Sequence, residues 1–222
     1  MALGTLGVAG MLLLLWQVFF WVPTEVTMGV SQRIFYIHVP GAWVAFMAFG
    51  LVAITSAMYL WLRDDRLDMA ALAAAEGGMV FATIMITSGP LWAKIAWGTY
   101  WTWEPRLTLT LLLWFVFVGY FLVRGSTDNP ERGKRFAAVV GILGAINIPL
   151  IHMSVKWFRS LHPQPVVMNP DGPTLDPAMG QTLATGLLTF TILFFGAFLL
   201  RYALEQAIRG ASMPTAPTEG LS

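Results

Sequence analysis

Six long stretches of apolar residues dominate this sequence and restrict the folds that it can adopt. A helix needs about 20 apolar residues to cross the hydrocarbon core of a bilayer, where lipid cannot pair with a free backbone N–H or C=O group. Hydrophobic residues make up 57% of the 222 residues and charged residues only 11%, which is too apolar for the surface of a soluble domain. The sequence therefore predicts an all-α, polytopic membrane protein. Its six transmembrane helices are expected at about residues 3–22, 40–62, 70–91, 107–123, 136–154 and 179–201.

The composition also excludes several kinds of function. Cysteine is absent, so the chain cannot form a disulfide, a thiolate metal centre or a covalent CxxCH haem site. A net charge of +1 provides no basic surface for a run of phosphates, so nucleic acid is not an expected partner. No nucleophile–base pair is evident, and we expect no enzymatic activity.

The basic residues indicate the orientation in the membrane. Of the 13 Lys and Arg residues, eight lie in the loops after the second and fourth helices or near the C-terminus, and five lie on the other side. Because cytoplasmic loops accumulate Lys and Arg, this bias favours cytoplasmic N- and C-termini. Residues 1–205 then form the transmembrane domain, and residues 206–222 are expected to be a disordered cytoplasmic tail, rich in Gly, Pro, Ser and Thr. The external loops are expected at about 23–39, 92–106 and 155–178.

The second external loop, LWAKIAWGTYWTWEPRLT, concentrates aromatic residues. It holds four of the ten tryptophans, Trp92, Trp97, Trp101 and Trp103. They could be lipid anchors, because indole rings favour the headgroup level. Alternatively, if the segment is helical, Trp97, Trp101 and Glu104 share one face and form a flat aromatic surface for a planar ligand. Lys94 and Arg106 could then bind carboxylates of that ligand, and Pro105 predicts the start of the fourth helix.

The three histidines all fall at or near the external side. His38 precedes the predicted start of the second helix, and His162 lies in the third external loop. Imidazole nitrogen is a common axial ligand of haem iron, so two histidines that flank the tryptophan loop favour such a site over ordinary solvated histidines. His152 lies near the outer end of the fifth helix, where we expect packing beside Asn147. Glu76 falls inside the third helix without an evident ionisable partner, and we expect it to pack between helices or dock a partner.

Three motifs in this order resemble a known family. WGTYWTWEPRLT is similar to the tryptophan-rich WWD signature of the haem-handling membrane proteins of cytochrome c biogenesis. The short six-helix form resembles the CcmC family among them. RIFYIHVPGAW and HMSVKWFRSLHPQ are similar to the segments of that family that carry the external-loop histidines. Glu104 is a departure, because the family usually has Asp there.

The resemblance implies non-covalent binding of haem b at the periplasmic face of a bacterial inner membrane. It implies His38 and His162 as axial ligands, with further site residues in the WWD-type segment: Trp97, Gly98, Trp101, Trp103, Glu104 and Arg106. It also implies delivery of haem to a periplasmic haem chaperone of the CcmE type, alongside an ABC-type complex in the same lipid bilayer. Two alternatives stay open. One is a transmembrane haem exporter or ABC-transporter permease subunit, with Glu76, Asn147 and Pro149 along its path. The other is a scaffold subunit whose tryptophans only anchor it in lipid.

Overall fold

The computed structural model describes residues 2–158, 160–162 and 175–211. The α-helices of this part are α1 (Ala2–Trp16), α2 (Phe35–Leu62), α3 (Asp65–Trp97), α4 (Pro105–Gly125), α5 (Pro130–Trp157) and α6 (Pro177–Ala211). A π-helical turn, Gln17–Trp21, continues α1, and a 3-10 turn, Val30–Ile34, leads into α2. Six helical segments of this part are long and apolar enough to cross a membrane. The predicted all-α fold with six transmembrane helices is confirmed.

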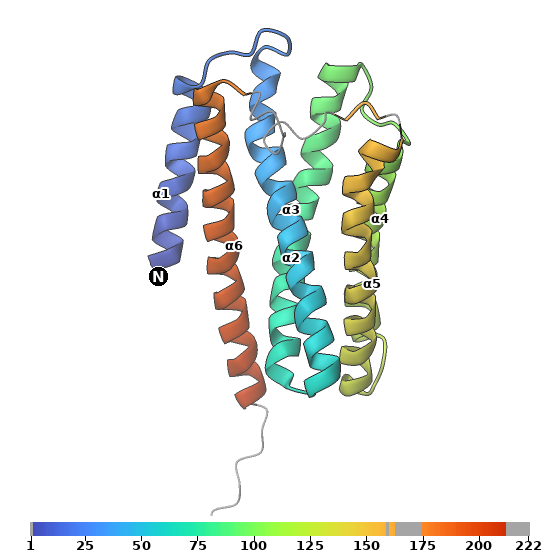
Figure 1. Ribbon diagram of the computed structural model, residues 1–222. Coiled ribbons are helices and arrows are strands. Elements are labelled where there is room, and N and C mark those ends of the chain that lie inside the picture. The colour runs from blue at the N-terminus through green and yellow to red at the C-terminus, as the bar shows by residue number, and fades with distance from the viewer. Residues whose placement is uncertain (1, 159, 163–174, 212–222) are drawn as a thin grey trace, which may run out of the picture.

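The helices form an elongated bundle with α2 at its centre (Figure 1). Helix α1 lies beside α6 at one edge, and α4 packs on α5 at the other. Helix α2 packs most extensively on α3 and also contacts α5 and α6. Helices α3 and α4 follow each other in the chain but share few contacts. The end of α3 and the start of α4 are therefore free to form the sides of a cavity.

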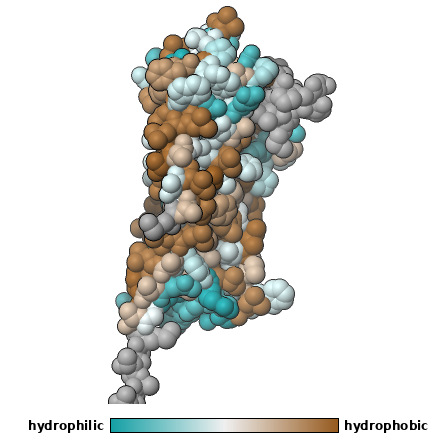
Figure 2. Space-filling view, turned by 90° about the vertical axis from the view of Figure 1, so that its left-hand side faces the viewer, coloured by the Kyte–Doolittle hydropathy of each residue, from teal (hydrophilic) through white to brown (hydrophobic). Residues whose placement is uncertain are grey.

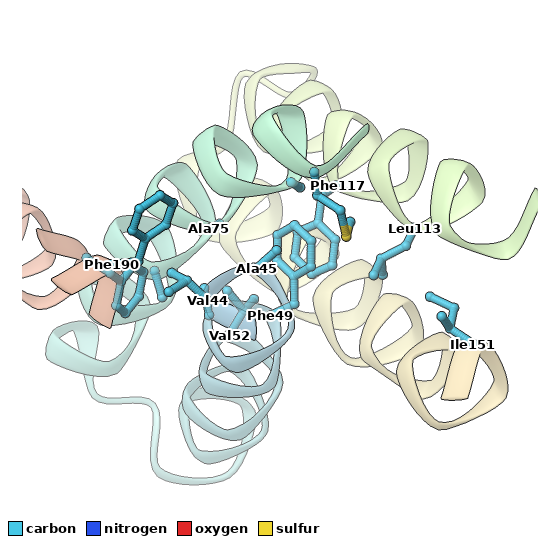
Figure 3. Packing of buried hydrophobic residues seen from close by; sticks show 14 of the residues in the cluster. Val44, Ala45, Phe49, Val52, Ala75, Leu113, Phe117, Ile151 and Phe190 are labelled. Carbon is cyan, nitrogen blue, oxygen red and sulfur yellow. The ribbon is translucent and has the colours of Figure 1, made fainter. Parts of the chain in front are cut away.

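Aromatic and small side chains make up the core between the helices. Phe49 of α2 stacks on Phe117 of α4, with ring centroids 3.6 Å apart, and both rings are fully buried (Figure 3). At Gly186 of α6, a Cβ atom would lie 2.9 Å from the Pro40 ring of α2. Because lipid is as apolar as the core, such close packing holds membrane helices together more than apolar burial does.

The outer surface of the bundle is suited to lipid. Large apolar side chains such as Phe20, Trp61 and Leu200 are more than two-thirds exposed, at 82%, 83% and 73%. Figure 2 shows hydrophobic residues along the length of one face, with hydrophilic residues gathered toward its two ends. An apolar surface of this extent would be unfavourable in water and is stable in a bilayer.

Several helices extend further than the apolar stretches predicted. Helix α2 begins at Phe35 instead of 40, and α3 continues to Trp97 instead of 91. Helix α6 runs to Ala211, so residues 206–211 of the predicted tail are helical, and 212–222 lie outside the described residues. The extension of α6 has a local cause, because Glu205 pairs with Arg201 and with Arg209, each four residues away. Hydropathy detects only the part of a helix that lies in hydrocarbon.

Charged residues cross-link the helices at the end opposite the cavity. Asp68 of α3 is 2% exposed and accepts two hydrogen bonds of 2.7 Å from Arg124 of α4. It also accepts one of 2.8 Å from Arg209 of α6. Glu76 pairs with Arg201 of α6 at 2.6 Å. Glu76 therefore has an ionisable partner on a neighbouring helix, which was not evident from the sequence.

Candidate functional site

A cavity of about 340 Å³ opens where α2 begins, α3 ends and α4 begins. Its walls come from these three helices, from Thr27 and Met28 in the connection before α2 and from residues just after α5. The aromatic and basic lining residues are His38, Trp92, Trp97, Trp101, Arg106 and His162. Most of the remaining lining is apolar, including Met85, Pro90 and Leu107. The cavity thus brings together five residues that the sequence had placed in one site.

His38 occupies the first turn of α2 and faces α3. The sequence placed it in a loop, but the helix begins three residues earlier, at Phe35. Its Nδ1 atom lies 3.0 Å from Ser88 Oγ, and its ring meets the Trp92 ring edge-on at 6.0 Å. At Gly89, a Cβ atom would lie 3.1 Å from Cε1 of His38. Glycine therefore allows the imidazole to lie close against the backbone of α3.

His162 is held at the cavity by Glu104. The carboxylate Oε2 of Glu104 accepts a hydrogen bond from Ser160 Oγ at 2.9 Å and another from Leu161 N–H at 2.8 Å. The Ser160 hydroxyl in turn accepts from the backbone N–H of His162 at 3.1 Å. The His162 ring stands edge-on to Trp97, with centroids 6.5 Å apart. These contacts join two segments that are 56 residues apart in sequence.

The connection from Gly98 to Glu104 is not helical, so the predicted common face of Trp97, Trp101 and Glu104 does not form. Helix α3 ends at Gly98, whose φ of 76° is left-handed and favours glycine. Trp97 is on the last turn of α3, whereas Trp101 follows Gly98 in the non-helical connection. Both still line the cavity. They reach it from two different elements instead of from one helix.

Three other predicted residues lie beside the cavity without lining it. Trp103 is 77% exposed and contacts Trp101 edge-on at 5.9 Å. Gly98 terminates α3. Glu104 precedes Pro105, which opens α4 as predicted, but its side chain makes no capping hydrogen bond there and binds the His162 segment instead. Lys94, a candidate for carboxylate binding, donates to the carbonyl of Gly98 at 2.9 Å and does not line the cavity.

Arg106 brings a positive charge into this apolar space. It lies on the first turn of α4 and lines the cavity. Among the described residues, none hydrogen-bonds or ion-pairs with its guanidinium. The nearest acid in sequence, Glu104, is engaged with Ser160 and Leu161. A cation without a carboxylate partner is favourable only where a ligand or solvent can approach it, so Arg106 suits an anionic group.

His152 lies apart from the cavity. It is exposed on α5, its Nδ1 atom is 3.0 Å from the carbonyl of Ile148, and its ring meets Phe46 edge-on at 5.1 Å. His152 thus packs against the neighbouring helix α2, as expected, and the amide of Asn147 donates to the carbonyl of Leu109 at 2.7 Å. His152 is the natural control for the other two histidines.

Sequence reasoning missed the α3 wall of the cavity. Its lining residues Met85, Gly89, Trp92 and Ala96 recur at intervals of three or four positions, the spacing of one helix face. Trp92 also donates a hydrogen bond to Met28 Sδ, in the loop that precedes α2. That loop turns at Glu25, whose pKa is lowered by hydrogen bonds from the N–H groups of Met28 and Thr27. Continuing the predicted third helix past residue 91 would have revealed this wall.

The side chains at the cavity fit a planar metalloporphyrin. Two imidazoles are suitable axial ligands for iron, and indole rings and apolar side chains can cover a macrocycle. The guanidinium of Arg106 can bind a carboxylate substituent. The fold and this cavity together define a polytopic membrane protein with an aromatic, histidine-bearing cavity at one end of its helix bundle.

Comparisons with known proteins agree with this class. The family model described as heme exporter protein C (CcmC) matches residues 1–215, and the chain belongs to that family. Heme exporter protein C of Bradyrhizobium diazoefficiens is 38% identical over 172 residues, which are 78% of this chain and 65% of that protein. The match thus spans just under two-thirds of that relative.

The matches to two further relatives cover somewhat more of each relative's length. Heme exporter protein C of Escherichia coli is 32% identical over 179 residues, 81% of this chain and 72% of that protein. A cytochrome c biosynthesis ccmC-like mitochondrial protein of Marchantia polymorpha is 32% identical over 176 residues, 79% of this chain and 73% of that protein.

Proposed function

We propose that this protein binds haem b non-covalently in the cavity, for use in cytochrome c maturation. His38 and His162 would be the axial ligands, Trp97 and Trp101 would contact the porphyrin, and Arg106 would bind a propionate. When bound, haem supplies an iron with two axial positions and an otherwise apolar macrocycle. The observation that carries the proposal is that His38 and His162, from distant parts of the chain, line the same cavity.

Membership of the family supports the wider role. Its relatives are named for heme export and for cytochrome c biosynthesis. We propose that the cavity opens on the periplasmic side of a bacterial inner membrane, with both termini cytoplasmic, as the distribution of Lys and Arg favours. There the protein would pass haem to a periplasmic chaperone of the CcmE type, alongside an ABC-type complex. An open, non-covalent site is suited to release as well as binding.

Absorption spectroscopy tests the proposed ligands. The protein purified from membranes is expected to take up haem with a sharp Soret band, and His38→Ala and His162→Ala are each expected to lose the haem or change the axial-ligand spectrum. His152→Ala is the matched control and is expected to retain the wild-type spectrum, because His152 lies outside the cavity. Absence of a Soret band in the wild type, or equal effects of all three substitutions, would contradict the proposal.

Transport of haem across the bilayer is the second candidate function, because the relatives are named exporters. The described intramembrane charges argue for binding over transport, since Glu76 and Asp68 are both engaged by arginines. Flux of haem from the inside to the outside of vesicles that contain this chain alone would favour transport. Binding without flux would favour the external site.

A further inference from the structure

The imidazole of His38 is fixed on one side by α3. Its Nδ1 atom lies 3.0 Å from Ser88 Oγ, across 50 positions of sequence. The adjacent Gly89 leaves room for Cε1, which would be 3.1 Å from a Cβ atom at that position. The Nδ1–Cε1 edge of the ring is therefore packed against α3.

The hydroxyl of Ser88 settles the direction of this hydrogen bond. Ser88 Oγ lies 2.6 Å from the carbonyl oxygen of Ile84, one helical turn earlier, and a carbonyl can only accept. The hydroxyl has a single proton, and that short contact uses it. Its lone pairs remain to accept from His38. The Nδ1 atom of His38 must therefore be the donor and carry the proton.

A neutral imidazole with its proton on Nδ1 has its lone pair on Nε2. His38 lines the cavity, and its hydrogen bond to Ser88 is made through Nδ1. The nitrogen whose lone pair can bind a metal is thus Nε2. Hydrogen bonds to the other ring nitrogen commonly fix the tautomer and orientation of metal-binding histidines.

We propose that Ser88 is a positioning residue that holds His38 in the Nδ1–H tautomer and leaves the Nε2 lone pair available to a metal in the cavity. The identity of that metal as haem iron rests on the proposed function. The hydrogen bond between His38 and Ser88 does not rest on the proposed function, because it is formed by residues of this chain alone.

Nitrogen-15 NMR of the haem-free protein tests the tautomer directly. In histidine-labelled protein, His38 is expected to show a protonated Nδ1 and a bare Nε2, with its signals assigned by their loss in His38→Ala. His152 provides an internal reference for this tautomer, because its Nδ1 atom faces a carbonyl, which can only accept. In Ser88→Ala the His38 signals are expected to move toward a mixture of tautomers. A wild-type Nε2–H signal, or unchanged signals in Ser88→Ala, would overturn the proposal.

The neighbouring Thr87 offers a matched control. Its hydroxyl also bonds to a carbonyl one turn earlier, that of Thr83 at 2.7 Å, but it points to the exposed side of α3 and does not contact His38. Thr87→Ala therefore removes a similar hydroxyl from the same turn. It is expected to leave the His38 NMR signals and haem binding as in the wild type.

Titration with ferric haem then measures the consequence for binding. Ser88→Ala is expected to weaken haem affinity by about 10- to 100-fold, the usual cost of losing such a contact, and Ser88→Thr, which keeps a hydroxyl, is expected to restore most of it. Equal affinities for Ser88→Ala and Thr87→Ala would overturn the role of Ser88. If the wild type binds no haem, the proposed function fails, whereas the NMR result still decides whether Ser88 sets the tautomer.

Discussion

Arg106 carries a charge into a cavity whose walls are mainly apolar, with no carboxylate bound to it among the residues described. Such a group is costly to bury unless something pairs with it. A haem propionate would supply the missing partner. The role proposed for Arg106 is therefore electrostatic, and it can be tested separately from any contribution of its side chain to packing.

We expect Arg106→Gln to weaken haem binding about tenfold or more, the scale of a lost charge-assisted hydrogen bond. Titrations with haem and with haem dimethyl ester, whose propionates carry no charge, measure the change in affinity. The wild type and Arg106→Gln should bind the ester with similar affinity, because the ester offers no anion. Lys94→Gln is the control, since Lys94 bonds to a backbone carbonyl outside the cavity. A loss of affinity for the ester as large as for haem would contradict propionate binding.

At the scale of elements, the connection between α3 and α4 organises a segment that follows α5. Glu104 does this through hydrogen bonds to Ser160 and to the backbone of Leu161, next to His162. Glutamate is the residue at which this chain departs from the usual Asp of the WWD signature. Here its side chain does not cap α4, so the shorter acid's advantage as a helix cap is not used.

We expect Glu104→Ala to weaken haem binding because it frees the segment that holds His162. The effect should be non-additive. In a double-mutant cycle, Glu104→Ala should cost much less affinity in the His162→Ala background than in the wild type, because both changes act on the same ligand. Haem titrations of the four proteins give the coupling. Full additivity would show that Glu104 acts independently of His162.

At the scale of the whole molecule, the cavity and the ion-pair network lie at opposite ends of the bundle. The network joins three helices through Asp68, which is 2% exposed and bound by Arg124 and Arg209. Removing one partner of a buried ion pair leaves the others unpaired, which is far more costly than breaking a pair at the surface.

We therefore expect Asp68→Asn to lower the free energy of unfolding by about 3–5 kcal/mol, measured by denaturation in detergent. The matched control is Asp65→Asn, whose side chain is 55% exposed and pairs with Lys134, with an expected cost of roughly 0–1 kcal/mol. Under conditions where Asp68→Asn remains folded, its haem affinity should match the wild type. Similar losses in the free energy of unfolding for the two substitutions would show that burial does not decide how much these ion pairs stabilise the protein.

Hydropathy predicted the six helices, because crossing a bilayer demands a run of apolar residues that any local window reveals. It predicted their ends less well. Trp97 belongs to α3 and His38 to α2, although both were placed in loops. Helix ends outside the hydrocarbon depend on caps and side-chain pairs, such as Lys94 with Gly98 and Glu205 with Arg209, which hydropathy does not measure.

The sequence by itself determined the membrane fold, the concentration of tryptophans in one short stretch of the chain and the histidines on either side of it. These are properties of composition and local order along the chain. Only the tertiary structure decided which residues share the cavity, that Ser88 meets His38, and that Glu104 holds the His162 segment. The physical reason is that these contacts join positions 50 or more residues apart, and they depend on how helices pack side by side, which no local pattern of residues specifies.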